Sequence, residues 1–327
     1  MAVRRLLPGM LALCLGAVLA RALALSLGVN NLFLAIALGV ITANVVGVPV
    51  RFAPGLETHK LWLGAGIVLM GASISLRTVL KVGGRVFLVV IAVAALTLVV
   101  VEFLARTVFG LSKRLSSLLA AGASICGVSA VVAVAGAVSA REDQVAYAAA
   151  TVLLFDAVTI AVYPIVGDLL TLSGTVFGIW AGVSMFSTGP VVAVGFAHSE
   201  VAGQWATMTK LSRNALIGVV ALAYASYYAR SGARSRPSVR TLWDEFPKFV
   251  LGMLALALVA SAGVLSATQR ASLEHASNWL FLLAFVGLGT EIRLADLRNA
   301  GPVPAVVVLL ALLVCSAVSL AVLLLTF

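Results

Sequence analysis

Apolar residues occur along this chain in long runs that are separated by short polar connections. A helix that crosses the hydrocarbon core of a bilayer needs about 20 apolar residues, and on that measure roughly eleven runs qualify as membrane segments. The runs lie near Leu6–Leu27, Leu32–Val48, Leu61–Leu76, Val86–Val108, Leu115–Val138, Val145–Val166, Val176–Ala197, Trp205–Tyr228, Phe249–Leu265, Trp279–Leu294 and Val303–Phe327.

Composition supports the same class of protein. Of the 327 residues, 62% are hydrophobic and 10% are charged, and the mean hydropathy is +1.15. A soluble domain of this length needs more polar surface than that, so most of the outer surface is expected to face lipid. The sequence therefore predicts an all-α integral membrane protein, with residues 1–327 forming a single multi-pass transporter domain.

The net charge of +10 is explained by topology. The basic residues lie in short connections between apolar runs, and Lys and Arg are enriched in cytoplasmic loops. We therefore expect a bacterial inner (cell) membrane protein with a cytoplasmic N-terminus and no nucleic-acid partner. No metal or cofactor is expected, because the cysteines lie inside apolar runs without metal-ligand spacing. These cysteines are Cys14, Cys126 and Cys315.

Two segments of the chain resemble each other. Residues Ala121–Val134 read A-G-A-S-I-C-G-V-S-A-V-V-A-V, and Ala181–Val194 read A-G-V-S-M-F-S-T-G-P-V-V-A-V. A weaker match at equal spacing joins two further segments, and together the matches indicate a duplicated core, as in many secondary transporters. The weaker match pairs Gly71, Ile74, Leu76 and Gly83 with Gly289, Ile292, Leu294 and Gly301.

The topology of the stronger repeat is open between two forms. If every run spans the membrane, the two copies are parallel. If both are re-entrant hairpins, the copies are antiparallel and Arg141 moves to the cytoplasmic side. Each arm of a hairpin would then have about 10–12 residues, or about 15–18 Å, which is half of the hydrocarbon thickness.

Both copies of this repeat combine glycine with polar side chains at mid-membrane depth. Gly and Pro let the backbone leave the helical path, which is tolerated in lipid only where protein or a wet cavity satisfies the freed groups. The N-terminal ends of half-helices favour an anion. The alternative is close packing of small residues between helices. The candidate substrate-binding residues here are Ser124, Cys126, Gly127, Ser129, Ser184, Ser187 and Thr188.

Ionisable residues also fall inside apolar runs. Asp156 lies near the middle of one run, and Lys210, Arg213 and Asn214 share one helical face in another. Each such group costs about 2.5–3.5 kcal/mol at a helix centre. Either Asp156 pairs with one of the cations, or Lys210 and Arg213 hold an oxyanion while Asp156 acts as counter-charge or coupling group. Glu102 is expected to form an interfacial ion pair with the next arginine along its run.

At these residues the chain resembles the bacterial YeiH-type sulfate exporter family over nearly its whole length. The resemblance rests on Gly122–Ala130, the Val145–Pro164 helix, Phe177–Gly182 and K-L-S-R at Lys210–Arg213. It implies a secondary transporter whose fold is related to cation/proton antiporters and bile-acid-type carriers, with inverted repeats and broken helices meeting at the midplane. Many such proteins are dimers, so the resemblance also implies a homodimer.

The chain departs from this family at three positions. A His followed by an acidic residue is usual where this chain has Phe186 and Ser187, and Asn is common at Asp156. A role of that His–acid pair in coupling or substrate contact is then absent here or has moved to Asp156. "Small anion" is therefore a better expectation than sulfate alone.

Taken together, the residues and the resemblance predict a secondary transporter of a small anion such as sulfate or a sulfonate. Its expected partners are the lipid bilayer, the anion, and H⁺ or Na⁺ as coupling ion. The rival within transport is a proton- or sodium-coupled antiporter in which Asp156 binds the cation. The rivals from other classes are a passive channel and a membrane enzyme. We expect no enzyme, since the sequence has no cluster of nucleophile, base and metal ligands.

Overall fold

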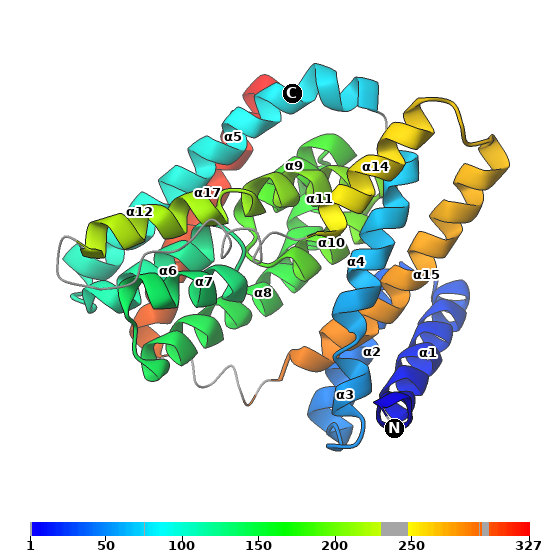
Figure 1. The fold of residues 1–327 in the computed structure, drawn as a ribbon, viewed down its shortest axis with the longest axis horizontal. Helices are drawn as coiled ribbons and strands as arrows, with labels where there is room; N and C mark the ends of the chain where they lie inside the picture. Colours follow the sequence, from blue (N-terminus) through cyan, green and yellow to red (C-terminus); the bar gives the residue numbers. More distant parts are fainter. Residues whose placement is uncertain (1, 75, 230–247, 294, 296–300) are drawn as a thin grey trace. The chain divides into compact units, whose positions relative to one another are not determined.

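The computed structural model describes residues 2–74, 76–229, 248–293, 295 and 301–327, which form helices and connections without a strand. Four of the described helical stretches are long and apolar enough to cross a membrane (Figure 1). These stretches are Arg5–Leu27, Leu80–Val108, Glu142–Leu169 and Pro302–Thr326. The protein is therefore an all-α membrane protein, as its hydropathy predicted.

The helices form two compact units. Unit 1 comprises Met1–Gly83 and Pro247–Leu294, and unit 2 comprises Gly84–Phe246 and Ala295–Phe327. The division falls inside the long helix α5, Leu76–Phe103.

Unit 1 contains six of the described helices. They are α1 (Ala2–Leu27), α2 (Asn31–Ile41), α3 (Ala53–Leu56), α4 (His59–Met70), α14 (Phe249–Ser261) and α15 (Ala267–Glu291). The π-helix η1 (Thr42–Val46) extends α2, and the 3-10 turn η2 (Gly71–Ser73) extends α4. The short helix α3 lies in a connection where the hydropathy pattern predicted no element.

Close helix packing in unit 1 depends on glycine. A Cβ at Gly66 on α4 would lie 2.8 Å from the Phe281 ring on α15, and Gly39 on α2 lies against the backbone of Gly289. Small residues let helix backbones approach in this way. Helices α4 and α15 are antiparallel, because His59 at the start of α4 contacts Gly287 near the end of α15. This orientation agrees with the weaker repeat, although Leu294 lies outside the described residues.

Unit 2 is built around α8, Glu142–Leu169, whose 28 residues make a helix about 42 Å long at 1.5 Å per residue. The helices α6 (Lys113–Ser124) and α7 (Val128–Val138) precede it. After it come α9 (Gly174–Ser184), α10 (Thr188–His198), α11 (Glu200–Asn214), α12 (Ile217–Ala229) and α17 (Pro302–Thr326). The π-helix η3 (Leu104–Val108) joins α5 to the connection before α6.

Helices α6 and α7 form a re-entrant hairpin, called hairpin 1. A Cβ at Gly122 would meet the Val131 side chain at 2.8 Å, whereas nine residues of continuous helix span about 13 Å. The chain therefore turns back at residues 125–127. Both ends of the hairpin lie at the start of α8, because Gln144 Nε2 on α8 donates to Ser112 Oγ at the root of α6, 3.0 Å away.

Helices α9 and α10 form hairpin 2, which turns at residues 185–187. His198 at the end of α10 stacks on Phe177 in the first turns of α9, with ring centroids 4.0 Å apart. Its Nε2 atom also lies 3.1 Å from the carbonyl of Leu172, just beyond the end of α8. Both ends of hairpin 2 therefore lie at the C-terminal end of α8, opposite hairpin 1.

The stronger repeat thus has the hairpin form of the two topologies considered. Both first arms end and both second arms begin at positions 60 residues apart, Ser124 with Ser184 and Val128 with Thr188. The arms have 12, 11, 11 and 11 residues, which agrees with the predicted length. The two copies enter from opposite ends of α8 and are antiparallel, so they form an inverted repeat.

Candidate functional site

The two hairpin tips meet beside the middle of α8. A Cβ at Gly127 would collide with the Ser187 hydroxyl of the opposite tip. Gly127 has a φ of +71° and a ψ of −136°. Residues other than glycine rarely adopt this backbone conformation. Glycine is required here both by the backbone and by the close approach of the tips.

Lys210 of α11 binds both tips. Its side chain is 0% exposed, and its Nζ atom donates to the carbonyls of Ile125 at 2.7 Å and Met185 at 3.1 Å. Ile125 belongs to hairpin 1 and Met185 to hairpin 2. One ammonium group therefore joins the two copies of the repeat.

Arg213, one helical turn later, makes similar contacts. It is also 0% exposed, and its Nε donates to the Ser124 carbonyl at 2.5 Å and its Nη1 to the Met185 carbonyl at 2.7 Å. Its Nη2 donates to the carbonyl of Ala123. All three nitrogens of the guanidinium are therefore hydrogen-bonded to backbone of the tips.

These contacts explain why two buried cations are tolerated. The last carbonyls of α6 and α9 have no partner within their own helices, and a helix C-terminus carries about half a negative charge. Lys210 and Arg213 supply both the donors and the opposite charge. Their side chains therefore stabilise the broken helices, and an anion at the tips would be attracted by their charge from behind these carbonyls.

Asp156 of α8 lies at the N-terminal end of α10. It is 3% exposed, and its Oδ1 accepts a hydrogen bond from the Ser187 N–H at 2.9 Å. Its Oδ2 is buried without a hydrogen-bond partner. Within the described part of the chain, no base lies within ion-pair distance of this carboxylate. The direct pairing with Lys210 or Arg213 that the sequence allowed is thus not formed.

Asn214 lies on the same side of the tips. Its Nδ2 donates to Thr188 Oγ1 at 3.0 Å, while its Oδ1 has no hydrogen-bond partner. The residue is 8% exposed. Asp156 and Asn214 therefore contact adjacent residues at the start of α10, and each keeps one oxygen unpaired.

The ionisable side chains buried at the tips are two bases and one acid, so their formal charge is +1. The C-terminal ends of α6 and α9 contribute about half a negative charge each, and the N-terminal ends of α7 and α10 contribute about half a positive charge each. These four contributions cancel. In their usual charged forms, Lys210 and Arg213 are balanced by the single carboxylate of Asp156, so one positive charge remains.

Comparison with known proteins identifies the family. The family model described as conserved hypothetical protein 698 matches residues 8–308. A UPF0324 membrane protein of Nitratidesulfovibrio vulgaris is 37% identical over 316 residues, covering 92% of this chain and 88% of that protein. The chain belongs to the UPF0324 membrane protein family.

Other members of the UPF0324 family are more distant. One from Listeria monocytogenes is 30% identical over 299 residues, covering 90% of this chain and 88% of that protein. One from Bartonella henselae is 32% identical over 273 residues, covering 83% and 77%. No solved structure matches the chain.

In this UPF0324 protein, the candidate residues predicted from sequence divide into two groups. Most of them lie at or beside the hairpin tips. The Ser124 and Ser184 hydroxyls, at the ends of α6 and α9, bond to carbonyls within their own helices. Ser129 lies in the first turn of α7 and is exposed. The residues at or beside the tips are Ser124, Cys126, Gly127, Ser187, Thr188, Lys210, Arg213, Asn214 and Asp156.

Sequence reasoning missed an aromatic contact that supports hairpin 2. The Tyr163 ring of α8 stacks on Trp180 with centroids 4.2 Å apart, and its hydroxyl lies 2.9 Å from Ser184 Oγ and 3.1 Å from Ser316 Oγ. Trp180 Nε1 donates to the Ser316 carbonyl at 3.0 Å. The consecutive helices α8 and α9 meet the distant helix α17 there, and no local motif marks the contact.

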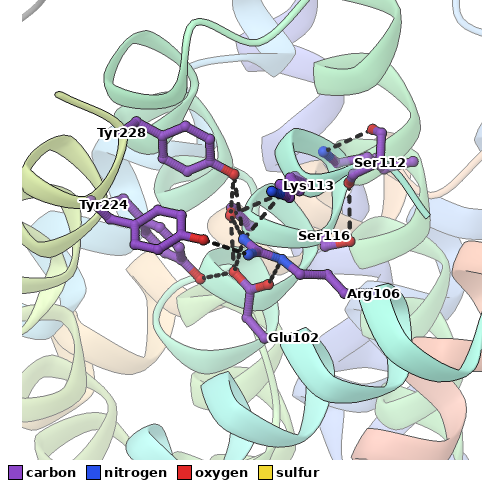
Figure 2. Close-up of polar contacts among 10 residues, drawn as sticks. Glu102, Arg106, Ser112, Lys113, Ser116, Tyr224 and Tyr228 are labelled. Atoms are coloured by element: carbon purple, nitrogen blue, oxygen red, sulfur yellow. Dashed lines mark hydrogen bonds and ion pairs between the residues drawn. The ribbon is translucent and has the colours of Figure 1, made fainter. Parts of the chain in front are cut away.

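A second polar cluster, called the root cluster, lies at the root of hairpin 1 (Figure 2). Glu102 forms the predicted ion pair with Arg106, and it also accepts hydrogen bonds from Tyr224 at 2.7 Å and Ser117 at 2.9 Å. Tyr228 lies 3.1 Å from Ser117 Oγ. The cluster ties α5, η3, α6 and α12 together.

Proposed function

We propose that this protein is a secondary transporter that moves a small anion, such as sulfate or a sulfonate, across the membrane. The observation that carries the proposal is the burial of two bases and one acid at the meeting point of two opposed hairpins. Lys210, Arg213 and Asp156 are all buried there, and burial makes an unbalanced charge costly unless a counter-ion is bound. A bound anion would supply the negative charge that the two bases lack.

The N-terminal ends of α7 and α10 are the best donors for such an anion. Unlike the carbonyl ends of α6 and α9, they are not occupied by Lys210 or Arg213. At α10 the Ser187 N–H already donates to Asp156, so the N–H groups of Thr188 and Gly189 are the ones that remain for an anion. Backbone N–H groups at a helix start bind oxyanions, and transporters built from inverted repeats use half-helices in this way. The Thr188 hydroxyl lies in the first turn of α10 and can assist.

Alternating access would come from movement of unit 2 as one body against unit 1. Lys210 and Arg213 each bind carbonyls of both hairpins. Separate opening of one hairpin would break buried charge-assisted hydrogen bonds, which are stronger than neutral ones. The hairpins are therefore expected to move together and not as independent gates.

The basic end of unit 2 is proposed to face the cytoplasm of a bacterial cell. Arg106, Lys113 and Arg141 lie at the end of α8 where hairpin 1 begins, whereas Asp168 lies at the opposite end. Lys and Arg concentrate on the cytoplasmic side of membrane proteins. A cysteine placed at position 141 should therefore react with an impermeant reagent only from the cytoplasmic side, and reaction from outside would overturn this orientation.

The proposal is tested with the purified full chain. The melting temperature is measured with sulfate, sulfite, thiosulfate, sulfonates and carboxylates, and the stabilising anion is then used in proteoliposome uptake. We expect Lys210→Met to lose the stabilisation and the uptake, Lys210→Arg to retain part of both, and Lys113→Met, an exposed lysine in the first turn of α6, to retain both.

Two results would contradict the proposal. If no anion of these classes stabilises the protein or enters proteoliposomes, the tip region is not an anion site. Counterflow of labelled substrate separates a transporter from the passive channel, because only a carrier that alternates between two faces exchanges solute against its gradient. Uptake without counterflow would therefore favour the channel.

A further inference from the structure

Two side-chain oxygens at the start of α10 have no hydrogen-bond partner. They are Asp156 Oδ2 and Asn214 Oδ1, from residues that are 3% and 8% exposed. A buried acceptor without a partner costs about 1–3 kcal/mol and more when it is charged. Two such atoms around one turn of the chain therefore indicate a ligand that supplies positive charge or donors.

The positions of the two groups are fixed by their other atoms. Asp156 Oδ1 accepts from the Ser187 N–H, and Asn214 Nδ2 donates to Thr188 Oγ1. Because Ser187 and Thr188 are consecutive, a carboxylate from α8 and an amide from α11 flank the same turn. Each of the two groups offers an acceptor oxygen, and the ionised carboxylate of Asp156 has no proton to donate.

The neighbouring cations do not satisfy these oxygens. Lys210 donates to Ile125 and Met185, and the guanidinium of Arg213 is bonded to carbonyls at all three of its nitrogens. Their positive charge acts on Asp156 from a distance, but they form no ion pair with it among the described residues.

We propose that Asp156 and Asn214 bind one small monovalent cation, a sodium ion or a proton, which is carried together with the anion. The inference rests on the proposed anion transport and names its coupling site. Carboxylate and amide oxygens are hard ligands suited to such an ion, and transporters with broken helices place coupling ions beside the substrate. A bound cation raises the excess charge of the tips from one to two, so the matching substrate is a divalent oxyanion.

The test measures the melting temperature of the purified full chain in sodium chloride and in choline chloride at equal ionic strength, over a range of pH. We expect a stabilisation by sodium or by low pH, and its loss in Asp156→Asn and in Asn214→Leu. One control is Asp168→Asn, because the Asp168 carboxylate is 78% exposed at the C-terminal end of α8. The other is Gln204→Leu on α11, where Gln204 contacts Glu200. Both should keep the response.

The two ions are separated by the same data. A melting temperature that rises with sodium at constant pH identifies sodium as the ligand. A melting temperature that rises at low pH in the wild type, but not in Asp156→Asn, identifies a proton. The inference is overturned if the wild type responds to neither, or if both site variants respond as the controls do. Because Asn214→Leu leaves all charges in place, it tests the site independently of any folding defect in Asp156→Asn.

Failure of the cation site can be distinguished from failure of the transport proposal. Anion stabilisation is measured separately in choline medium for each variant. An anion response that persists without any cation response leaves the anion proposal intact and removes only the coupling site. A cation response without any anion response leaves a cation site in place and removes the anion proposal, and with it the coupling role of that site.

Discussion

Unit 2 contains two groups of charged side chains that differ in how completely their atoms are paired. In the root cluster, Glu102 and Arg106 are one acid and one base in direct contact. The hydroxyls of Ser117 and Tyr224 also donate to the Glu102 carboxylate. At the hairpin tips, two bases accompany one acid, and one oxygen each of Asp156 and Asn214 has no hydrogen-bond partner. A cluster whose acid and base are in direct contact stabilises a fold, whereas one whose charges are not in contact is suited to a ligand.

The depth of the two groups adds to this difference. Glu102 and Arg106 have side chains that are 16% and 24% exposed, so water or lipid headgroups can screen them. Lys210 and Arg213 are fully buried. Electrostatic interactions are stronger away from water, and so are the costs of leaving charge uncompensated.

The largest expected effect comes from Arg213→Ala. The change leaves the carbonyls of Ala123 and Ser124 without their charged partner and leaves Met185 with Lys210 alone. Removal of one partner of a buried charged contact costs about 3–5 kcal/mol. Thermal unfolding in detergent measures the loss. Arg114→Ala removes an exposed arginine from the first turn of α6 and should change stability little. Equal effects of the two variants would show that the tip contacts are not important for stability.

The next effect is that of Gly127→Ala. Its positive φ and the nearby Ser187 hydroxyl together predict a loss of about 2–4 kcal/mol. Gly136→Ala lies on the same hairpin in ordinary helix, where a Cβ meets no atom within 4 Å. It should raise stability by about 0.5–1 kcal/mol. The opposite signs are read from the two melting temperatures, and a destabilised Gly136→Ala would contradict the local geometry.

Glu102→Gln is expected to have a moderate effect on stability and none on ligand response. It removes the charge that binds Arg106 and weakens the hydrogen bonds from Tyr224 and Ser117, at a cost of about 1–2 kcal/mol. The ion-dependent shifts in melting temperature should remain. Loss of those shifts would mean that the root cluster belongs to the functional site and does not differ in role from the tips.

Tyr224→Phe should give the smallest change. It removes one hydroxyl that donates to Glu102 at 2.7 Å and keeps the ring, so a loss of about 1 kcal/mol is expected. Chemical unfolding of the variant and the wild type under the same conditions resolves such a difference. A loss as large as that of Glu102→Gln would show that Tyr224 supports the carboxylate through more than this bond.

Much of the architecture could be predicted from hydropathy and repeat alone. Each of the eleven predicted runs overlaps at least one helix. Two runs contain a hairpin, and the last run matches α17. The arm lengths of the hairpins also agreed, because Gly127 and the Gly/Ser/Pro content near Ser187 mark where helical backbone can stop. The short helix α3 was missed, since its four residues are too few to show a period.

The charged residues of the site could be chosen from the sequence, because their cost in lipid makes Asp156, Lys210 and Arg213 conspicuous wherever the chain folds. The atoms that form hydrogen bonds with these side chains could not be predicted. Helical spacing shows that Lys210 and Arg213 share a face, but it does not tell which atoms that face meets. Only the tertiary structure brings the carbonyl ends of two half-helices to those cations. It also places Asp156 at the start of α10, where the carboxylate accepts from the Ser187 N–H. Hydropathy depends on each segment alone, whereas hydrogen bonds between segments depend on how all of them pack.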